Sequence, residues 1–156
     1  MRKGLNAVKE AREWIGTPVV WEASLKGKGC DCRGLVAGVA RELGWPEGSA
    51  FEASVGAYAR NIDEAKLTAG LDRLLRRVRP DMMHKGDVLG FTIKGKMQHL
   101  GIFAGEGRMV HAYMTPPSKV VEVPLGVYWT NRLAGVWRWK SLRPTAPLLE
   151  GKTNGR

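Results

Sequence analysis

The sequence predicts an α+β fold in which helices form the first half of the chain and an antiparallel sheet forms the second. Up to residue 78, apolar residues recur every three or four positions, which is the spacing of amphipathic helices. From Gly86 onward, short runs of β-branched and aromatic residues are bounded by Gly, Pro or Asn, which is typical of strands. The length of 156 residues fits one domain with a buried core.

The first half contains three candidate helices. The first ends where Gly16-Thr17-Pro18 interrupts the pattern, and a glycine-containing loop leads into the second. The second begins at Cys32 and ends near Gly44, after which Trp45-Pro46-Glu47-Gly48 is expected to form a turn. The predicted helices are residues 6–15, 32–44 and 62–78.

The second half predicts an antiparallel sheet of about five strands, on which the helices are expected to pack. The expected strands are residues 87–93, 97–104, 108–113, 120–123 and 133–139. We assign residues 1–140 to one folded domain. Residues 141–156 contain two prolines, two glycines and several charges, and we interpret them as a flexible tail for docking to a partner.

The chain carries 25 basic and 15 acidic residues, a net charge of +10. A positive surface attracts polyanions such as nucleic acid, an anionic envelope or an acidic protein, although it also serves solubility. The densest basic cluster is Arg73, Arg76, Arg77 and Arg79, and no zinc-finger, P-loop or helix-turn-helix spacing accompanies it. We therefore expect no specific nucleic-acid binding.

The N-terminal segment has no apolar run typical of a signal peptide, and no run approaches the ~20 residues of a membrane span. We expect a protein that is made in the cytoplasm and does not insert into membranes. Cys30 and Cys32 are separated by one residue, which is poor spacing for a disulfide, so reduced thiols are expected.

Cys32 is a candidate nucleophile because it opens a strong helical pattern. At a helix N-terminus, backbone N–H groups and the helix dipole stabilise a thiolate, which predicts a pKa below the usual ~8.5. His99 lies in an alternating segment and His111 follows twelve positions later. A hairpin turning at Gly105-Glu106-Gly107 would bring both histidines together, which favours a relay of cysteine, base histidine and orienting histidine.

The same residues have structural alternatives. Cysteine is often a small core residue, and lone histidines on strands are mostly satisfied in the core or exposed. Cys30 could be a resolving thiol, a metal ligand or a core residue, and the core is favoured. A zinc site of Cys30, Cys32, His99 and His111 has suitable ligand types, but its spacing matches neither finger nor ribbon patterns, so no metal is expected.

Five motifs in order resemble the NlpC-type cell-wall cysteine peptidases, papain-like enzymes of bacteria and phages that cut peptidoglycan stem peptides. The resemblance spans residues 7–139. Its motifs are Gly16-Thr17-Pro18-Val19-Val20-Trp21, Asp31-Cys32-Arg33-Gly34-Leu35, Lys85-Gly86-Asp87-Val88-Leu89, His99-Leu100-Gly101-Ile102 and Val110-His111-Ala112. The resemblance implies a papain-like NlpC fold, with the nucleophile at a helix N-terminus packed on the sheet, and no cofactor.

The resemblance also implies roles for individual residues. Cys32 would be the nucleophile, His99 the general base and acid, and His111 the group that orients His99. The backbone N–H of Cys32 would help to hold the oxyanion. Asp31 would help to bind the free amine of a stem peptide, and the expected scissile bond joins D-Glu to the following diamino acid.

The chain departs from the family pattern around the substrate pocket. Val19 stands where Tyr is usual, Glu22-Ala23 where a Gly pair is usual, and Arg33 where Ser is common. Because these positions shape the pocket, the candidate substrate-binding residues are Val19, Trp21, Asp31 and Arg33.

A finer resemblance is to the tail-associated peptidases of phages and gene transfer particles. It is carried by Gly29-Cys30-Asp31-Cys32, the Ala112-Tyr113 ending and Leu133-Ala134-Gly135-Val136-Trp137-Arg138. It implies a tail-tip enzyme that opens peptidoglycan during genome delivery, with tail-tip or hub proteins as partners. The alternative hypothesis is a structural plug or adaptor of a tail tip whose altered pocket no longer cuts.

Overall fold

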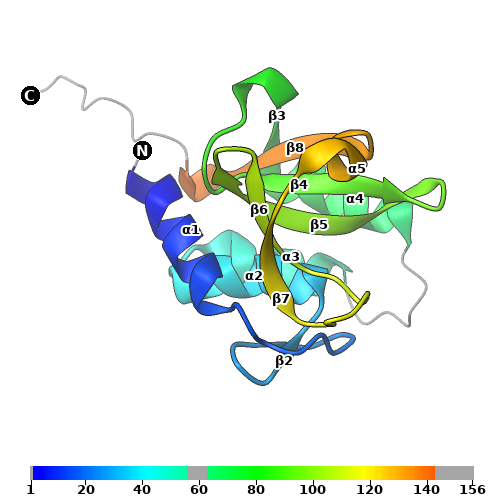
Figure 1. Cartoon of the computed structure of the whole chain (residues 1–156). Helices are drawn as coiled ribbons and strands as arrows, with labels where there is room; N and C mark the ends of the chain where they lie inside the picture. The colour runs from blue at the N-terminus through cyan, green and yellow to red at the C-terminus, as the bar shows by residue number, and fades with distance from the viewer. Residues whose placement is uncertain (1, 56–62, 143–156) are drawn as a thin grey trace, which may run out of the picture.

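A computed structural model describes residues 2–55 and 63–142 and confirms the α+β prediction (Figure 1). Helices α1 (Arg2–Glu13), α2 (Cys32–Glu42) and α3 (Pro46–Val55) lie on one side of an antiparallel sheet with strand order β3-β8-β4-β5-β6-β7. The strands are β3 (Leu75–Val78), β4 (Val88–Ile93), β5 (Lys96–Gly105), β6 (Arg108–Ala112), β7 (Val120–Pro124) and β8 (Leu133–Trp139). Helix α4 (Glu64–Leu74) precedes β3, and α5 (Gly126–Thr130) connects β7 to β8.

Apolar side chains form two clusters, because successive residues of a strand point to opposite faces of the sheet. The larger cluster packs α2 against the sheet and includes Val88 and Trp137. The smaller cluster contains the neighbouring residues Leu89 and Val136 and is joined by Trp129 of α5. Both faces of the central strands are therefore buried.

Helix α2 begins at Cys32 because Asp31 caps its N-terminus. The Asp31 carboxylate accepts a hydrogen bond from the Gly34 N–H at 2.8 Å, which satisfies one of the backbone donors that a helix start leaves open. Gly34 has no room for a side chain, since a Cβ there would lie 1.9 Å from the carbonyl oxygen of Ala23. The capped turn is thus held close to the loop before it.

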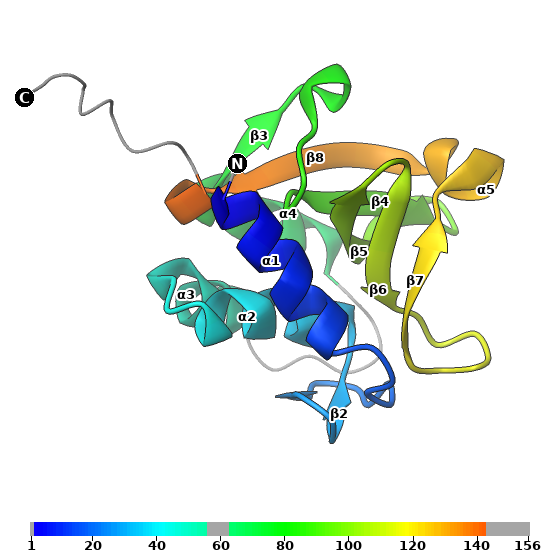
Figure 2. The ribbon, with the colours of Figure 1, turned by 60° about the vertical axis from the view of Figure 1, so that its left-hand side comes forward.

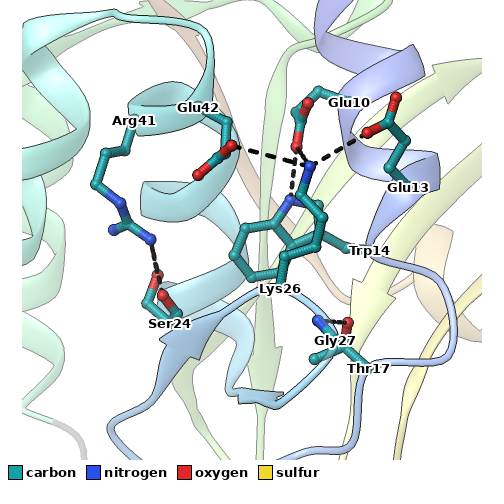
Figure 3. Close-up of polar contacts among 9 residues, drawn as sticks. All are labelled: Glu10, Glu13, Trp14, Thr17, Ser24, Lys26, Gly27, Arg41 and Glu42. Carbon is teal, nitrogen blue, oxygen red and sulfur yellow. Dashed lines mark hydrogen bonds and ion pairs between the residues drawn. The ribbon is translucent and has the colours of Figure 1, made fainter.

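That loop, residues 16–31, contains a small hairpin of β1 (Ser24–Leu25) and β2 (Gly29–Cys30) and is held by polar contacts (Figure 3). The Lys26 ammonium lies 2.6 Å from Glu10 and 3.2 Å from Glu13, both on α1. Arg41 of α2 donates to the carbonyl oxygen of Ser24 at 2.7 Å. The loop is therefore fixed to both helices.

The end predicted for the third helix is wrong. The helix predicted over residues 62–78 ends at Leu74, because Leu75–Val78 form β3 and pair with β8 from Leu75↔Trp139 to Val78↔Val136. The sheet accordingly has six strands rather than about five.

The turn predicted over residues 45–48 is instead the start of α3. Proline is tolerated there because the first helical position needs no N–H partner. Burial of Phe51 against Trp139, with ring centroids 6.2 Å apart, secures the helix on the core.

The predicted tail, residues 141–156, lies outside the described residues from position 143 onward. Its first residues belong to a short 3₁₀ turn, Lys140–Leu142, in which the Ser141 N–H and hydroxyl both donate to Glu47 of α3. Among the described helices, none is long and apolar enough to cross a membrane.

Candidate active site

Cys32 occupies the first position of α2, at the point where β5 and β6 part. The β5–β6 ladder runs from Gly105↔Arg108 to Gly101↔His111, where the pairing of these two described strands ends. The Cys32 thiol approaches β5 just past that point and lies 4.0 Å from the carbonyl oxygen of Gln98. Cys32 as a whole is only 7% exposed to solvent.

The two predicted histidines are brought together, as the hairpin argument requires. His111 pairs with Gly101, so His99 is its diagonal neighbour on the same face. Nε2 of His99 lies 2.8 Å from Nδ1 of His111. This contact leaves Nδ1 as the His99 ring nitrogen that can exchange a proton with a thiol.

Aromatic side chains enclose the histidine pair. The ring of His99 lies 4.8 Å from Tyr113 and 5.1 Å from Trp129, and His111 stacks on Tyr113 at 5.7 Å. Both histidines are at most 4% exposed. Trp129 was not predicted as a site residue, because α5 is a five-residue helix made largely of residues that favour strands.

Burial sets the protonation of the site. It lowers the pKa of His111 to about 4 and, together with the neighbouring His111, lowers the pKa of His99 well below its usual value. Burial, reinforced by the charge of Asp31, raises the pKa of Cys32 to about 11. The predicted lowering of the Cys32 pKa is therefore wrong for the unliganded site, because loss of solvation outweighs the helix N-terminus.

One small pocket joins residues from the 16–31 loop, the start of α2 and the parted strands. Three of the four predicted substrate-binding residues line it: Val19, Trp21 and Asp31, together with Cys32 and His99. The lining is completed by five residues that were not predicted from the sequence: Ile93, Gln98, Ala112, Tyr113 and Met114. The lining is mostly apolar, which suits a short peptide segment held away from water.

Arg33 is the predicted pocket residue that the structure places elsewhere. Its side chain is buried and its Nη2 lies 3.7 Å from Oδ2 of Asp31. Oδ2 also accepts from the Glu22 N–H at 2.8 Å, while Oδ1 accepts from Gly34. The Asp31 carboxylate is thus engaged by backbone N–H groups and balanced by a cation.

Cys30 is a fully buried free thiol in the larger apolar cluster. Burial raises its pKa to about 12. Its N–H donates to the carbonyl oxygen of Pro18, and its own carbonyl oxygen accepts from Val20, so the residue joins the two sides of the loop. Across residues 2–55 and 63–142, no three His, Cys, Asp or Glu side chains are grouped so that they could hold a metal ion.

The chain matches a known family. The model of the NlpC/P60 family matches residues 16–138. The gamma-DL-glutamyl hydrolase of Bacillus subtilis (strain 168) is 30% identical over 137 residues, which are 86% of this chain and 29% of that protein. The chain therefore spans less than a third of this relative's length.

Solved structures show the same fold. An NlpC/P60 family protein from Bacillus cereus has a TM-score of 0.64 at 21% identity, over 87% of this chain and 40% of that protein. The NlpC/p60 domain of the peptidoglycan hydrolase SagA has a TM-score of 0.60 at 22% identity, over 86% of this chain and 97% of that domain. Because the family match covers most of the chain, including the helix that begins at Cys32 and the strands of both histidines, the chain belongs to the NlpC/P60 family.

Proposed function

We propose that the chain is a cysteine peptidase that hydrolyses stem peptides of peptidoglycan. The observation that carries the proposal is the shared pocket of Cys32 and His99, with His99 held 2.8 Å from His111. A thiol, a base and a group that orients the base are the parts that nucleophilic hydrolysis of an amide requires. Catalysis by these three side chains needs no cofactor.

The first half of the reaction forms a thioester. Nδ1 of His99 takes the proton of the Cys32 thiol as the sulfur attacks the peptide carbonyl carbon. Charge develops on the carbonyl oxygen, for which the backbone N–H of Cys32 is the proposed donor. The C–N bond then breaks, and His99 returns the proton to the leaving nitrogen.

The second half consumes water. His99 takes a proton from a water molecule, the hydroxide oxygen attacks the thioester carbon, and the C–S bond breaks. The product carboxylic acid leaves and the Cys32 thiol recovers its proton. Throughout, Nε2 of His99 keeps its hydrogen and donates it to Nδ1 of His111, which requires a neutral His111.

The proposed substrate bond joins D-Glu to the following diamino acid. Two findings support it: the relative from B. subtilis is named a gamma-DL-glutamyl hydrolase, and a structural neighbour is named a peptidoglycan hydrolase. Val19, Trp21 and Asp31 are the proposed contacts on the acyl side. Arg33 acts on Asp31 rather than on the substrate, which weakens the attraction of that carboxylate for a free amine.

The finer proposal is a tail-tip enzyme of a phage or gene transfer particle, made in the host cytoplasm and docked to hub proteins. It is supported by the motifs at residues 29–32 and 133–138 and by the net charge of +10. Mass spectrometry of purified particles should detect the chain among the tail proteins. Its absence from particles that carry a complete tail would contradict this placement.

The activity is tested on purified peptidoglycan with wild type, Cys32→Ala and the matched control Cys30→Ala. We expect new amines from wild type and from Cys30→Ala, no release by Cys32→Ala, and fragments whose masses identify the cleaved bond. Full release by a folded Cys32→Ala would contradict the mechanism. Silence of all three folded proteins would instead favour the structural plug or adaptor.

A further inference from the structure

A second groove lies beside the histidine pair, at the β7 edge of the sheet. Residues lining it include His111, Tyr113, Lys119, Val121, Tyr128 and Trp129. Tyr113 also lines the pocket that contains Cys32, so the pocket and the groove share a wall. A bound chain can therefore run from one into the other across Tyr113.

The strand register explains how this groove forms. His111 pairs with Val121, so both side chains stand on one face, and Tyr113 follows two positions later. The Trp129 ring of α5 lies 5.2 Å from the rings of both His111 and Tyr113. Figure 2 shows β6, β7 and α5 together at this end of the sheet.

The proposed chemistry determines which part of a substrate faces the groove. His99 must return a proton to the leaving nitrogen, so that nitrogen lies on the His99 side of the scissile carbonyl. The ring of Tyr113 lies 4.8 Å from that of His99. In this orientation, the residues after the scissile bond would continue over Tyr113 into the groove.

The charges around the groove favour an anion. Among the described residues that line it, Lys119 is the one that carries a charge at neutral pH, since burial keeps His111 neutral. The nearby acid of β7, Glu122, is bound by Arg12 at 2.8 Å and by Arg108 at 3.0 Å. The guanidinium of Arg132, 3.6 Å above the Tyr128 ring, adds further positive charge at the rim.

We propose that this groove binds the leaving-group portion of the substrate and that Lys119 binds its free carboxylate. The inference rests on the proposed peptidase function and adds a substrate preference to it. The enzyme selects stem peptides whose chain ends shortly after the scissile bond, because an amidated or cross-linked end offers Lys119 no negative charge.

Two probes that differ in one group test the preference. One is the tripeptide L-Ala-D-Glu-diamino acid with a free C-terminal carboxylate, and the other is its C-terminal amide. We expect wild type to cleave the carboxylate form with a kcat/KM about tenfold higher, as a charge-assisted hydrogen bond would give. Lys119→Gln should bring the ratio close to one, whereas Lys119→Arg and the matched surface control Lys9→Gln should preserve it.

Binding separates this proposal from the proposed function. Cys32→Ala, titrated calorimetrically with each probe, should bind the carboxylate form about tenfold more tightly, and the double variant with Lys119→Gln should lose the difference. Equal binding of the two probes, or no binding of either, would overturn the groove assignment even if wild type cleaves both. A binding preference without turnover by wild type would uphold the groove and overturn the peptidase function.

Discussion

The stability of the fold should fall as the pH is lowered from 7.5 to 5, because the site buries two neutral histidines. Burial lowers the pKa of His111 to about 4 and that of His99 well below its usual value. In the unfolded chain both side chains titrate near pH 6.5. Below that pH the unfolded state binds more protons than the folded state, so protonation favours unfolding.

The magnitude follows from His111. With a folded pKa of about 4 and an unfolded pKa of about 6.5, this residue alone removes about 2 kcal/mol of unfolding free energy between pH 7.5 and 5. The contribution of neutral His111 to the unfolding free energy is complete above pH 6.5 and is lost progressively as the pH falls towards 4. His99 acts in the same direction, so 2 kcal/mol is a lower bound for the pair.

The assay is urea unfolding, followed by far-UV circular dichroism at half-unit steps from pH 7.5 to 5. The control is His84→Gln, because His84 is exposed and its removal should leave the slope unchanged. In His111→Gln, the loss of unfolding free energy between pH 7.5 and 5 should be smaller than in wild type by about 2 kcal/mol, whatever the stability of this variant at pH 7.5. A wild-type stability that does not change with pH, or a slope as steep in His111→Gln as in wild type, would refute the neutral buried pair.

Three further outcomes are expected. Asp87→Asn should lower the unfolding free energy, measured by urea unfolding, by about 3 kcal/mol, since this buried carboxylate is paired with Arg138 of β8. The control Asp81→Asn should leave it nearly unchanged, because Asp81 is exposed. Gly34→Ala should abolish peptide cleavage, because its Cβ would lie 1.9 Å from the Ala23 carbonyl oxygen and displace the pocket loop. The pH profile of kcat/KM should have an acid limb with an apparent pKa below 6.5, because burial lowers the pKa of His99. An apparent pKa above 6.5 would contradict the role of His99 as the free base.

Much of the fold could be predicted because its strands carry their own signals. The residues after Gly86 alternate and end at turn residues, and they form β4 to β8 close to the predicted bounds. Strand β3 could not be predicted locally, since Leu75 and Val78 keep a helical spacing and only pairing with β8 makes the segment a strand. Helix α3 was not predicted, because Pro46 and Gly48 are typical of a turn. Gly48 instead allows α3 to pack closely on α2, since a Cβ there would lie 2.8 Å from the carbonyl oxygen of Ala37.

The site shows a similar division. Cys32, His99 and His111 could be placed together because one helix start and one hairpin position them. The burial of Arg33 against Asp31 could not be predicted from the sequence, because it depends on how the 16–31 loop folds over α2. The direction of the Cys32 pKa shift was also beyond local reasoning, since it depends on how completely the surrounding chain removes water.

The neutral resting state has a consequence for catalysis. An ion pair of Cys32 thiolate and His99 imidazolium would place two charges in a site enclosed by aromatic rings. The one carboxylate among the described pocket residues, Asp31, is already engaged by Arg33 and two backbone N–H groups, so it does little to stabilise an imidazolium. In the proposed mechanism, proton transfer from Cys32 to His99 therefore becomes favourable only as the sulfur bonds to a substrate carbon and the charge moves to the carbonyl oxygen. Because the thiolate is the reactive species towards oxidants, the same burial that slows deprotonation also protects Cys32 until a substrate occupies the pocket.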